Sequence, residues 1–170
     1  ILAVKDEYIF DFLGIEEEHS ERDLEQKLIQ NIRAFLLELG SDFSFLGNQY
    51  KVELSDKEYF IDLLLFHRKL QSLVAIELKI GEFLPEYKGK MEFYLNILND
   101  KVKLPHENEA IGIIICKSKD RTIVEYSLKS SNLPIGISTY STSEKLPKNY
   151  QNLLPSNEEL SEKFENYFKE

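Results

Sequence analysis

The sequence predicts an α/β domain in which a mixed central sheet is flanked by helices. Two observations carry this prediction. Apolar residues recur at helical spacing up to residue 40, and from residue 43 they form strand-like runs that then alternate with helical segments. Strands joined by a tight turn must be antiparallel, whereas strands separated by helices are free to be parallel. The expected order of elements is α-β-β-β-α-β-α-β.

The first expected helix begins after Ser20, a good N-cap, with Glu21 and Asp23 placed to favour its positive end. Gly40 supplies the stop. The residues predicted to form its buried stripe are Leu24, Leu28, Ile32, Phe35, Leu36 and Leu39.

Three strands are expected next, at Phe43–Leu54, Tyr59–His67 and Leu73–Ile80. The last two are nearly continuous in apolar residues, which is typical of strands covered on both faces. Pro85 is suited to the first turn of a second helix, where a missing N–H costs little. The buried face of that helix is predicted to hold Tyr87, Met91, Tyr94, Leu95 and Leu98.

The remaining elements are a strand at Ile111–Cys116, a helix capped by Asp120 that runs to about Lys129, and a strand at Ile135–Tyr140. We expect the domain to occupy residues 20–148. Residues 1–19 are expected to be an arm or linker whose apolar side chains need a partner surface, in this domain or in a missing one. A peripheral helix is expected in residues 149–170.

The composition suits one soluble domain. The chain has 170 residues, 42% of them hydrophobic and 30% charged. It shows no signal-peptide pattern and no apolar run long enough to span a membrane, and its single cysteine, Cys116, cannot form an internal disulfide. We therefore expect a cytoplasmic protein without a membrane partner. The chain starts at Ile1 rather than a methionine, so we expect a segment of a longer protein.

Three charged residues interrupt the apolar strands: Asp62, Glu77 and Lys79. Glu77 and Lys79 are two apart, so their side chains share one face of a strand. If the hairpin turns at Lys69-Leu70, position 67 pairs with 72, 66 with 73 and 62 with 77. The two carboxylates then lie opposite each other. A slip of one residue would send them to opposite faces.

Two adjacent carboxylates repel each other, and a divalent cation such as Mg²⁺ or Mn²⁺ is the usual remedy. A neighbouring lysine is suited to orienting a water or to stabilising charge on a phosphoryl oxygen. Asp62, Glu77 and Lys79 therefore indicate metal-assisted hydrolysis of a phosphodiester. The alternative is a solvated face for the Glu–Lys pair and a turn or cap role for the aspartate. The apolar neighbours weigh against it, because buried charges need partners.

Other candidates have weaker support from the sequence. Glu25 lies at the edge of the first helix's apolar stripe, where it would either reach the carboxylates or form a surface pair. Lys90 and Tyr94 share a helix face and would line a substrate groove, although Tyr94 is equally suited to the core. Lys117, Lys119 and Arg121 form the densest basic cluster, suited to a phosphate backbone or simply to a solvated loop.

The net charge of −9, from 30 acidic and 21 basic residues, argues against a stand-alone nucleic-acid binder. Phosphate neutralisation by a basic face supplies most of the non-specific affinity of such proteins. A carboxylate metal site, in contrast, needs local negative charge. The net charge therefore argues against a nucleic-acid substrate for this chain alone, but not against a carboxylate metal site.

Several ordered blocks within about residues 4–147 resemble the C-terminal nuclease domain of bacterial YhcG-like proteins, of the PD-(D/E)XK superfamily. These blocks are FLLELG, YFIDLLLFHR, LVAIELK, PEYKGKMEFYLN, IGIIICKSKDRTIVEY and PIGISTY. The resemblance implies a restriction-endonuclease-like αβββαβ core, which agrees with the pattern of elements.

By this resemblance Asp62 and Glu77 match the superfamily's acidic metal ligands and Lys79 its motif lysine. The backbone carbonyl of Leu78 would be a further ligand, and Glu25 matches a first-helix glutamate. Lys90 and Tyr94 match a Gln-x-x-x-Tyr motif of RecB-like nucleases, with lysine in place of glutamine. Ile61 stands where the superfamily name has proline.

The resemblance implies a Mg²⁺-dependent or Mn²⁺-dependent nuclease that acts on nucleic acid, on DNA rather than RNA. It also implies a separate N-terminal domain, which would supply substrate affinity that this acidic chain lacks; a homodimer partner would serve equally. Two other hypotheses stay open. The domain is either a nuclease-fold module that binds nucleic acid or a partner protein without cutting, or a structural domain for assembly.

Overall fold

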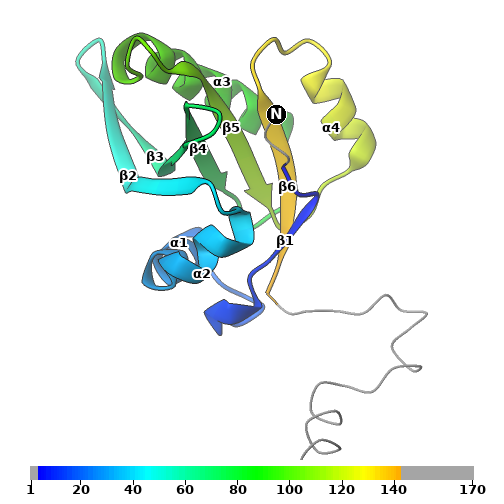
Figure 1. Ribbon diagram of the computed structural model, residues 1–170. Helices are drawn as coiled ribbons and strands as arrows, with labels where there is room; N and C mark the ends of the chain where they lie inside the picture. Colours follow the sequence, from blue (N-terminus) through cyan, green and yellow to red (C-terminus); the bar gives the residue numbers. More distant parts are fainter. Residues whose placement is uncertain (1–3, 143–170) are drawn as a thin grey trace, which may run out of the picture.

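The computed structural model describes residues 4–142, which form a six-stranded sheet between two helical layers (Figure 1). The sheet order is β1-β6-β5-β4-β3-β2. The strands are β1 (Glu7–Ile9), β2 (Phe43–Leu54), β3 (Lys57–His67), β4 (Ser72–Leu78), β5 (Asn108–Cys116) and β6 (Ile135–Ser141). The hairpins β2–β3 and β3–β4 are antiparallel, and β4, β5, β6 and β1 are parallel. The mixed sheet is as predicted.

The helices cover both faces of the sheet. The helices α1 (Glu21–Gln30) and α2 (Ile32–Leu39) pack on one face, after a 3₁₀ turn, η1 (Asp11–Leu13). The helices α3 (Pro85–Ile97) and α4 (Arg121–Leu128) pack on the other, and a π-helical turn, η2 (Leu98–Val102), follows α3. None of the helices within residues 4–142 is both long and apolar enough to cross a membrane. The helix predicted in residues 149–170 lies outside the described residues.

The predicted first helix is broken at Asn31 into α1 and α2. The backbone N–H of Asn31 donates to the carbonyl of Lys27, and its side-chain Nδ2 donates to the same oxygen at 2.9 Å. An asparagine side chain that competes for backbone carbonyls in this way interrupts a helix. The prediction of one continuous helix was therefore wrong, although both segments bury the predicted stripe.

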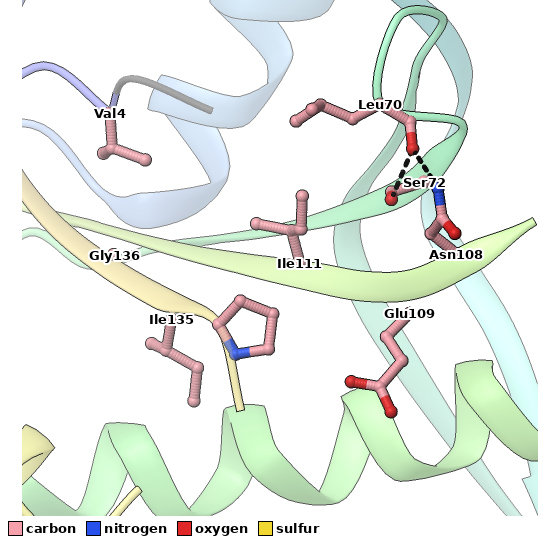
Figure 2. A pocket seen from close by; sticks show the side chains of 9 residues that line it. Val4, Leu70, Ser72, Asn108, Glu109, Ile111, Ile135 and Gly136 are labelled. Atoms are coloured by element: carbon pink, nitrogen blue, oxygen red, sulfur yellow. Dashed lines mark hydrogen bonds between the residues drawn. The ribbon is translucent and has the colours of Figure 1, made fainter. Parts of the chain in front are cut away.

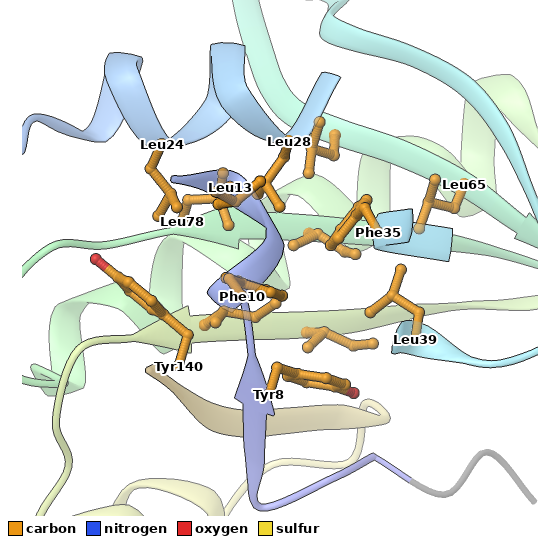
Figure 3. Close-up of a cluster of buried hydrophobic side chains, with 14 of the residues drawn as sticks. Tyr8, Phe10, Leu13, Leu24, Leu28, Phe35, Leu39, Leu65, Leu78 and Tyr140 are labelled. Atoms are coloured by element: carbon orange, nitrogen blue, oxygen red, sulfur yellow. The ribbon is translucent and has the colours of Figure 1, made fainter. Parts of the chain in front are cut away.

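The N-terminal segment belongs to this domain and not to a linker. Its strand β1 pairs in parallel with β6, and the Phe10 N–H donates to the carbonyl of Ser141 at 2.7 Å. Tyr8, Phe10 and Leu13 are buried in the core beneath α1 and α2 (Figure 3). The sheet thus includes β1, which precedes the predicted domain boundary between residues 19 and 20, so that boundary was wrong. A strand of three residues is too short to show a period in the sequence.

The core has two halves, one on each face of the sheet. All seven residues of β4 are buried. Val74, Ile76 and Leu78 face α1 and α2, while Leu73 and Ala75 face α3. The near-continuous apolar sequence of this strand thus reflects burial on both faces, as predicted.

The long β2–β3 hairpin changes the layer against which it packs part of the way along. In β2, Phe43 and Phe45 join the core beneath α1 and α2, whereas Tyr50, Val52 and Leu54 join the core beneath α3. Two irregularities lie between these sets: a register shift between Phe45 and Gly47, and Gln49, which has a left-handed backbone with φ of 44°. The ladder pairs Asn48 with Leu63 and Tyr50 with Ile61, which puts Gln49 opposite Asp62.

Candidate active site

The β3–β4 hairpin has the register expected from the sequence. His67 pairs with Ser72 and Phe66 with Leu73, and the ladder continues to Leu63 and Ile76. At the next pair, Asp62 and Glu77, hydrogen bonds from backbone N–H groups to carboxylate side chains take the place of the backbone-to-backbone bonds. The Asp62 N–H donates to Glu77 Oε1 at 3.2 Å, and the Leu78 N–H donates to Asp62 Oδ2 at 2.9 Å. Each of the two predicted carboxylates therefore accepts a hydrogen bond from a backbone N–H of the other's strand, where β3 and β4 separate.

Glu77 is buried, with only 3% of its surface exposed. Burial in apolar surroundings, reinforced by the charge of Asp62, raises the pKa of Glu77 from 4.5 to about 8. Lys90, the Asp62 N–H and Lys79 act in the opposite direction but do not offset it. In the absence of a cation, Glu77 therefore holds a proton at neutral pH.

Glu25 reaches the carboxylates through a residue that the sequence did not single out. Gln49 Nε2 donates to Glu25 Oε1 at 3.0 Å, to Glu25 Oε2 at 3.1 Å and to Asp62 Oδ1 at 3.1 Å. Burial is the main cause that raises the pKa of Glu25, and the charge of Asp62 adds to it. An open pocket of about 500 Å³ lies here, lined by Glu21, Arg22, Glu25, Gln26, Asn48, Gln49 and Asp62.

The sequence of β2 gives no local signal that identifies Gln49. Apolar side chains occupy odd positions at Phe43 and Phe45 and even positions at Tyr50, Val52 and Leu54. Odd and even positions of a regular strand point to opposite faces, so the two sets reach different helical layers without requiring an irregular residue.

Two lysines lie beside the carboxylates, and each lies over a tyrosine of α3. Lys79 Nζ is 4.8 Å from the centre of the Tyr87 ring, and Lys90 Nζ is 5.5 Å from the centre of the Tyr94 ring. Lys90 Nζ also lies 3.8 Å from Glu77 Oε2. Burial, with the charges of Glu77 and Asp62, raises the pKa of Tyr94 to about 12. The α3 helix thus forms one wall of the site.

The basic cluster after β5 makes other contacts. Lys117 Nζ donates to the carbonyl of Glu17 at 2.7 Å. Lys119 Nζ pairs with Asp6 and donates to the carbonyl of Ile137 at 3.1 Å. Arg121 is the first residue of α4. Within residues 4–142, no hydrogen bond or ion pair joins these three side chains to Asp62 or Glu77.

The donor set at β4 fits a Mg²⁺ ion. Residues 4–142 hold no group of three or more His, Cys, Asp or Glu side chains placed to bind a metal ion. Mg²⁺ does not require one, because it is commonly held by one or two carboxylates and keeps several waters. The N–H and C=O of one strand residue point to the same side. The carbonyl of Leu78 therefore faces the side on which Asp62 lies, as its N–H does.

A second pocket, of about 670 Å³, lies at the other end of the parallel strands (Figure 2). Leu70 and Ser72, from the β3–β4 turn and the start of β4, form part of its wall, and Val4 faces them across it. Ile111 and Ile135 add aliphatic surface from β5 and β6. None of the predicted site residues lines this pocket.

Comparison with known proteins gives the family and the fold of the chain. A family model described as the YhcG PDDEXK nuclease domain matches residues 2–155. YhcG of Escherichia coli (strain K12) is 39% identical over 126 residues, which are 74% of this chain and 34% of that protein. The chain thus spans about a third of the length of this relative.

Two solved structures are similar in fold. A repair endonuclease from Pyrococcus abyssi has a TM-score of 0.51 at 14% identity, over 76% of this chain and 50% of its own. EndoMS in complex with double-stranded DNA has a TM-score of 0.54 at 14% identity, over 78% of this chain and 51% of its own. The fold is that of PD-(D/E)XK nucleases, and the chain belongs to the YhcG PDDEXK nuclease domain family.

Proposed function

We propose that this nuclease domain hydrolyses phosphodiester bonds of DNA with Mg²⁺ or Mn²⁺ at Asp62 and Glu77. The observation that carries the proposal is that each of these two carboxylates accepts a hydrogen bond from a backbone N–H of the other's strand, at the point where the two buried strands separate. Keeping Glu77 protonated next to Asp62 is an energetically unfavourable way to accommodate two acidic side chains in a buried site. A divalent cation would favour the ionised form of both groups.

Asp62, Glu77 and the carbonyl of Leu78 would hold the cation. When bound, it would lower the pKa of a coordinated water and neutralise charge on a phosphoryl oxygen. Asp62 has one oxygen on the Leu78 N–H and the other on Gln49, so its carboxylate is oriented before a ligand arrives. Leu78 is 1% exposed, and its backbone is therefore held in place by the core.

Lys79 is proposed to orient the attacking water or to stabilise the developing charge on the phosphate. Its ammonium lies over the Tyr87 ring, a contact that keeps the charge near Glu77 without a tight ion pair. Lys90 and Tyr94 are proposed to contact the substrate from α3, in the place of the glutamine motif of related nucleases. Glu25 is proposed to support Asp62 through Gln49.

DNA is proposed as the substrate because a similar fold, EndoMS, has been solved with double-stranded DNA. The net charge of −9 makes weak, salt-sensitive binding the expectation for this chain alone. Lys117 and Lys119 would contribute phosphate contacts only by giving up their present partners Glu17, Asp6 and Ile137. Arg121, at the start of α4, would contribute a third contact. Further affinity is proposed to come from the rest of a longer protein, or from a second copy in a homodimer. A cytoplasmic location is part of the same proposal.

Cleavage of plasmid DNA, single-stranded DNA and RNA with Mg²⁺ or Mn²⁺ tests the proposal. We expect Asp62→Ala and Lys79→Ala to lose activity by about 100-fold or more, because each removes a group that acts on the transition state. Asp100→Ala and Lys101→Ala are matched controls, since both residues are exposed on η2, beyond the far end of α3.

Equal activity in all variants would refute the assignment. Binding of DNA without cleavage by any variant, with and without the rest of a longer protein, would favour a non-cleaving module. Mn²⁺ should also raise the melting temperature of the wild type but not of Asp62→Ala, because a ligand that binds only the folded state stabilises it.

A further inference from the structure

Gln49 has an unusual backbone for its place in the fold. Among residues 4–142, four residues other than glycine have a positive φ: Gln49, Ser55, Asp56 and Gln71. Ser55, Asp56 and Gln71 lie in the turns that close the two hairpins, where such a conformation is common. Gln49 lies inside β2. A left-handed residue within a strand costs free energy and persists only where the surrounding structure requires it.

The side chain of Gln49 indicates what requires it. Three carboxylate oxygens, two from Glu25 and one from Asp62, lie 3.0 to 3.1 Å from its Nε2 atom. Three acceptors around one atom identify that atom as the amide nitrogen, since an amide oxygen there would face only other acceptors. Gln49 therefore donates to both acids without adding a charge between them.

The backbone conformation and the side-chain contacts have one explanation. On either side of the Gln49–Asp62 pair, the hairpin packs against different helical layers. Asp62 lies at this change, with Glu77 facing α3 on one side and Glu25 of α1 on the other. The left-handed turn at Gln49 puts its amide between the carboxylates of Glu25 and Asp62.

We propose that Gln49 is a positioning residue for the metal site. Its amide and the Leu78 N–H each hold one oxygen of Asp62, so the carboxylate cannot rotate away from Glu77. The same amide holds Glu25 next to Asp62 against their mutual repulsion. Gln49 thereby sets cation affinity without contacting the cation. This inference rests on the proposed function, because it concerns the same site.

The test compares Gln49→Gly with Gln71→Gly. Glycine adopts a positive φ without strain, so the metal-free form of both variants should remain folded. Gln71 is a matched control because it is also left-handed, with φ of 52°, and its side-chain amide donates to a turn carbonyl, that of Arg68, at the other end of β4. Mn²⁺ affinity is measured by calorimetric titration of the metal-free proteins, and the melting temperature is recorded without metal.

We expect Gln49→Gly to bind Mn²⁺ about 10- to 100-fold more weakly, the usual effect of losing a group that orients a metal ligand. Its metal-free melting temperature should change no more than that of Gln71→Gly, which should bind Mn²⁺ like the wild type. Unchanged affinity in Gln49→Gly, or an equal loss in both variants, would overturn the inference.

The wild type and Asp62→Ala separate this inference from the proposed function. If the wild type binds Mn²⁺ and Asp62→Ala does not, the metal site stands, and the Gln49 variants decide the inference alone. If the wild type does not bind Mn²⁺, the proposed function fails, and the inference fails with it.

Discussion

At the scale of single residues, the site depends on how two acids share a buried space. Asp62 gives one oxygen to the Leu78 N–H and the other to the Gln49 amide. Glu77 has the Asp62 N–H and a lysine at 3.8 Å. The N–H is neutral and the lysine is distant, so together they do not offset the cost of burying a charged carboxylate. Glu77 therefore retains a proton that an exposed glutamate would release.

This proton predicts how the stability of the metal-free protein depends on pH. The pKa of Glu77 is about 8 in the folded state and near 4.5 in the unfolded chain. Between these values the folded state binds one more proton, so the free energy of unfolding falls as the pH rises, by up to about 1.4 kcal/mol per pH unit. The contribution is complete below pH 4.5 and lost above pH 8. Denaturant unfolding from pH 5 to pH 9 measures it.

Glu77→Gln should flatten this dependence, because glutamine is neutral at every pH. Glu109→Gln, at an exposed position on β5, should keep the wild-type slope. If Glu77→Gln and the wild type have the same slope, the folded state does not hold the proton on Glu77.

At the scale of elements, the position of α3 against the sheet decides where Lys90 and the two tyrosines lie. The close approach is at Gly112 of β5, where an added Cβ would lie 2.6 Å from Met91 Cγ and 2.7 Å from its sulfur. Met91 is fully buried and follows Lys90 in α3. The absence of a side chain at Gly112 therefore allows the helix to pack at this distance.

Gly112→Ala is expected to lower the free energy of unfolding by about 1–3 kcal/mol, because extra volume in a packed core forces side chains or backbone to move. Nuclease activity should fall as well, since the displaced helix carries Lys90. Thermal unfolding and the cleavage assay measure the two effects.

Gly89→Ala on the same helix is the control. Among the described residues, no atom beyond the neighbouring residues and the local helix backbone lies within 4 Å of a Cβ at Gly89. Alanine is favoured over glycine in a helix by up to about 1 kcal/mol. It should therefore raise the melting temperature. A stabilising Gly112→Ala would show that α3 is free to shift on the sheet.

At the scale of the whole molecule, the first segment of the chain completes the core. Phe10 is fully buried and packs against Tyr8, Phe35 and Tyr140, with ring centres 5.7 to 6.2 Å apart. Its N–H is bonded to the last residue of β6. Residues 4–13 thus join α2 to the far edge of the sheet.

Phe10→Ala is therefore expected to cost about 3–5 kcal/mol, the usual effect of removing a buried aromatic side chain. Phe12→Ala, two residues away and half-buried, should cost less. Denaturant unfolding compares them. Equal and small effects would restore the interpretation of this segment as a linker outside the domain.

The sequence predicts most of the elements because their signals are local. The bounds of β2 are those predicted, and β3, β4, β5 and β6 begin or end within three residues of the expected positions. The capping box at Ser20 and Asp23 and the cap at Asp120 are also present. Helical period, strand runs and caps each depend on residues close together in the chain.

The adjacency of Asp62 and Glu77 could also be predicted, because a tight turn between apolar strands allows one register, and this register places the two acids side by side. By itself, the sequence therefore determined the mixed sheet and the two acids at its centre. Only the tertiary structure decided that Glu25 meets Asp62 through Gln49, and that Tyr8 and Phe10 complete the core. These contacts join segments far apart in the chain, and their geometry exists only after both helical layers have packed on the sheet.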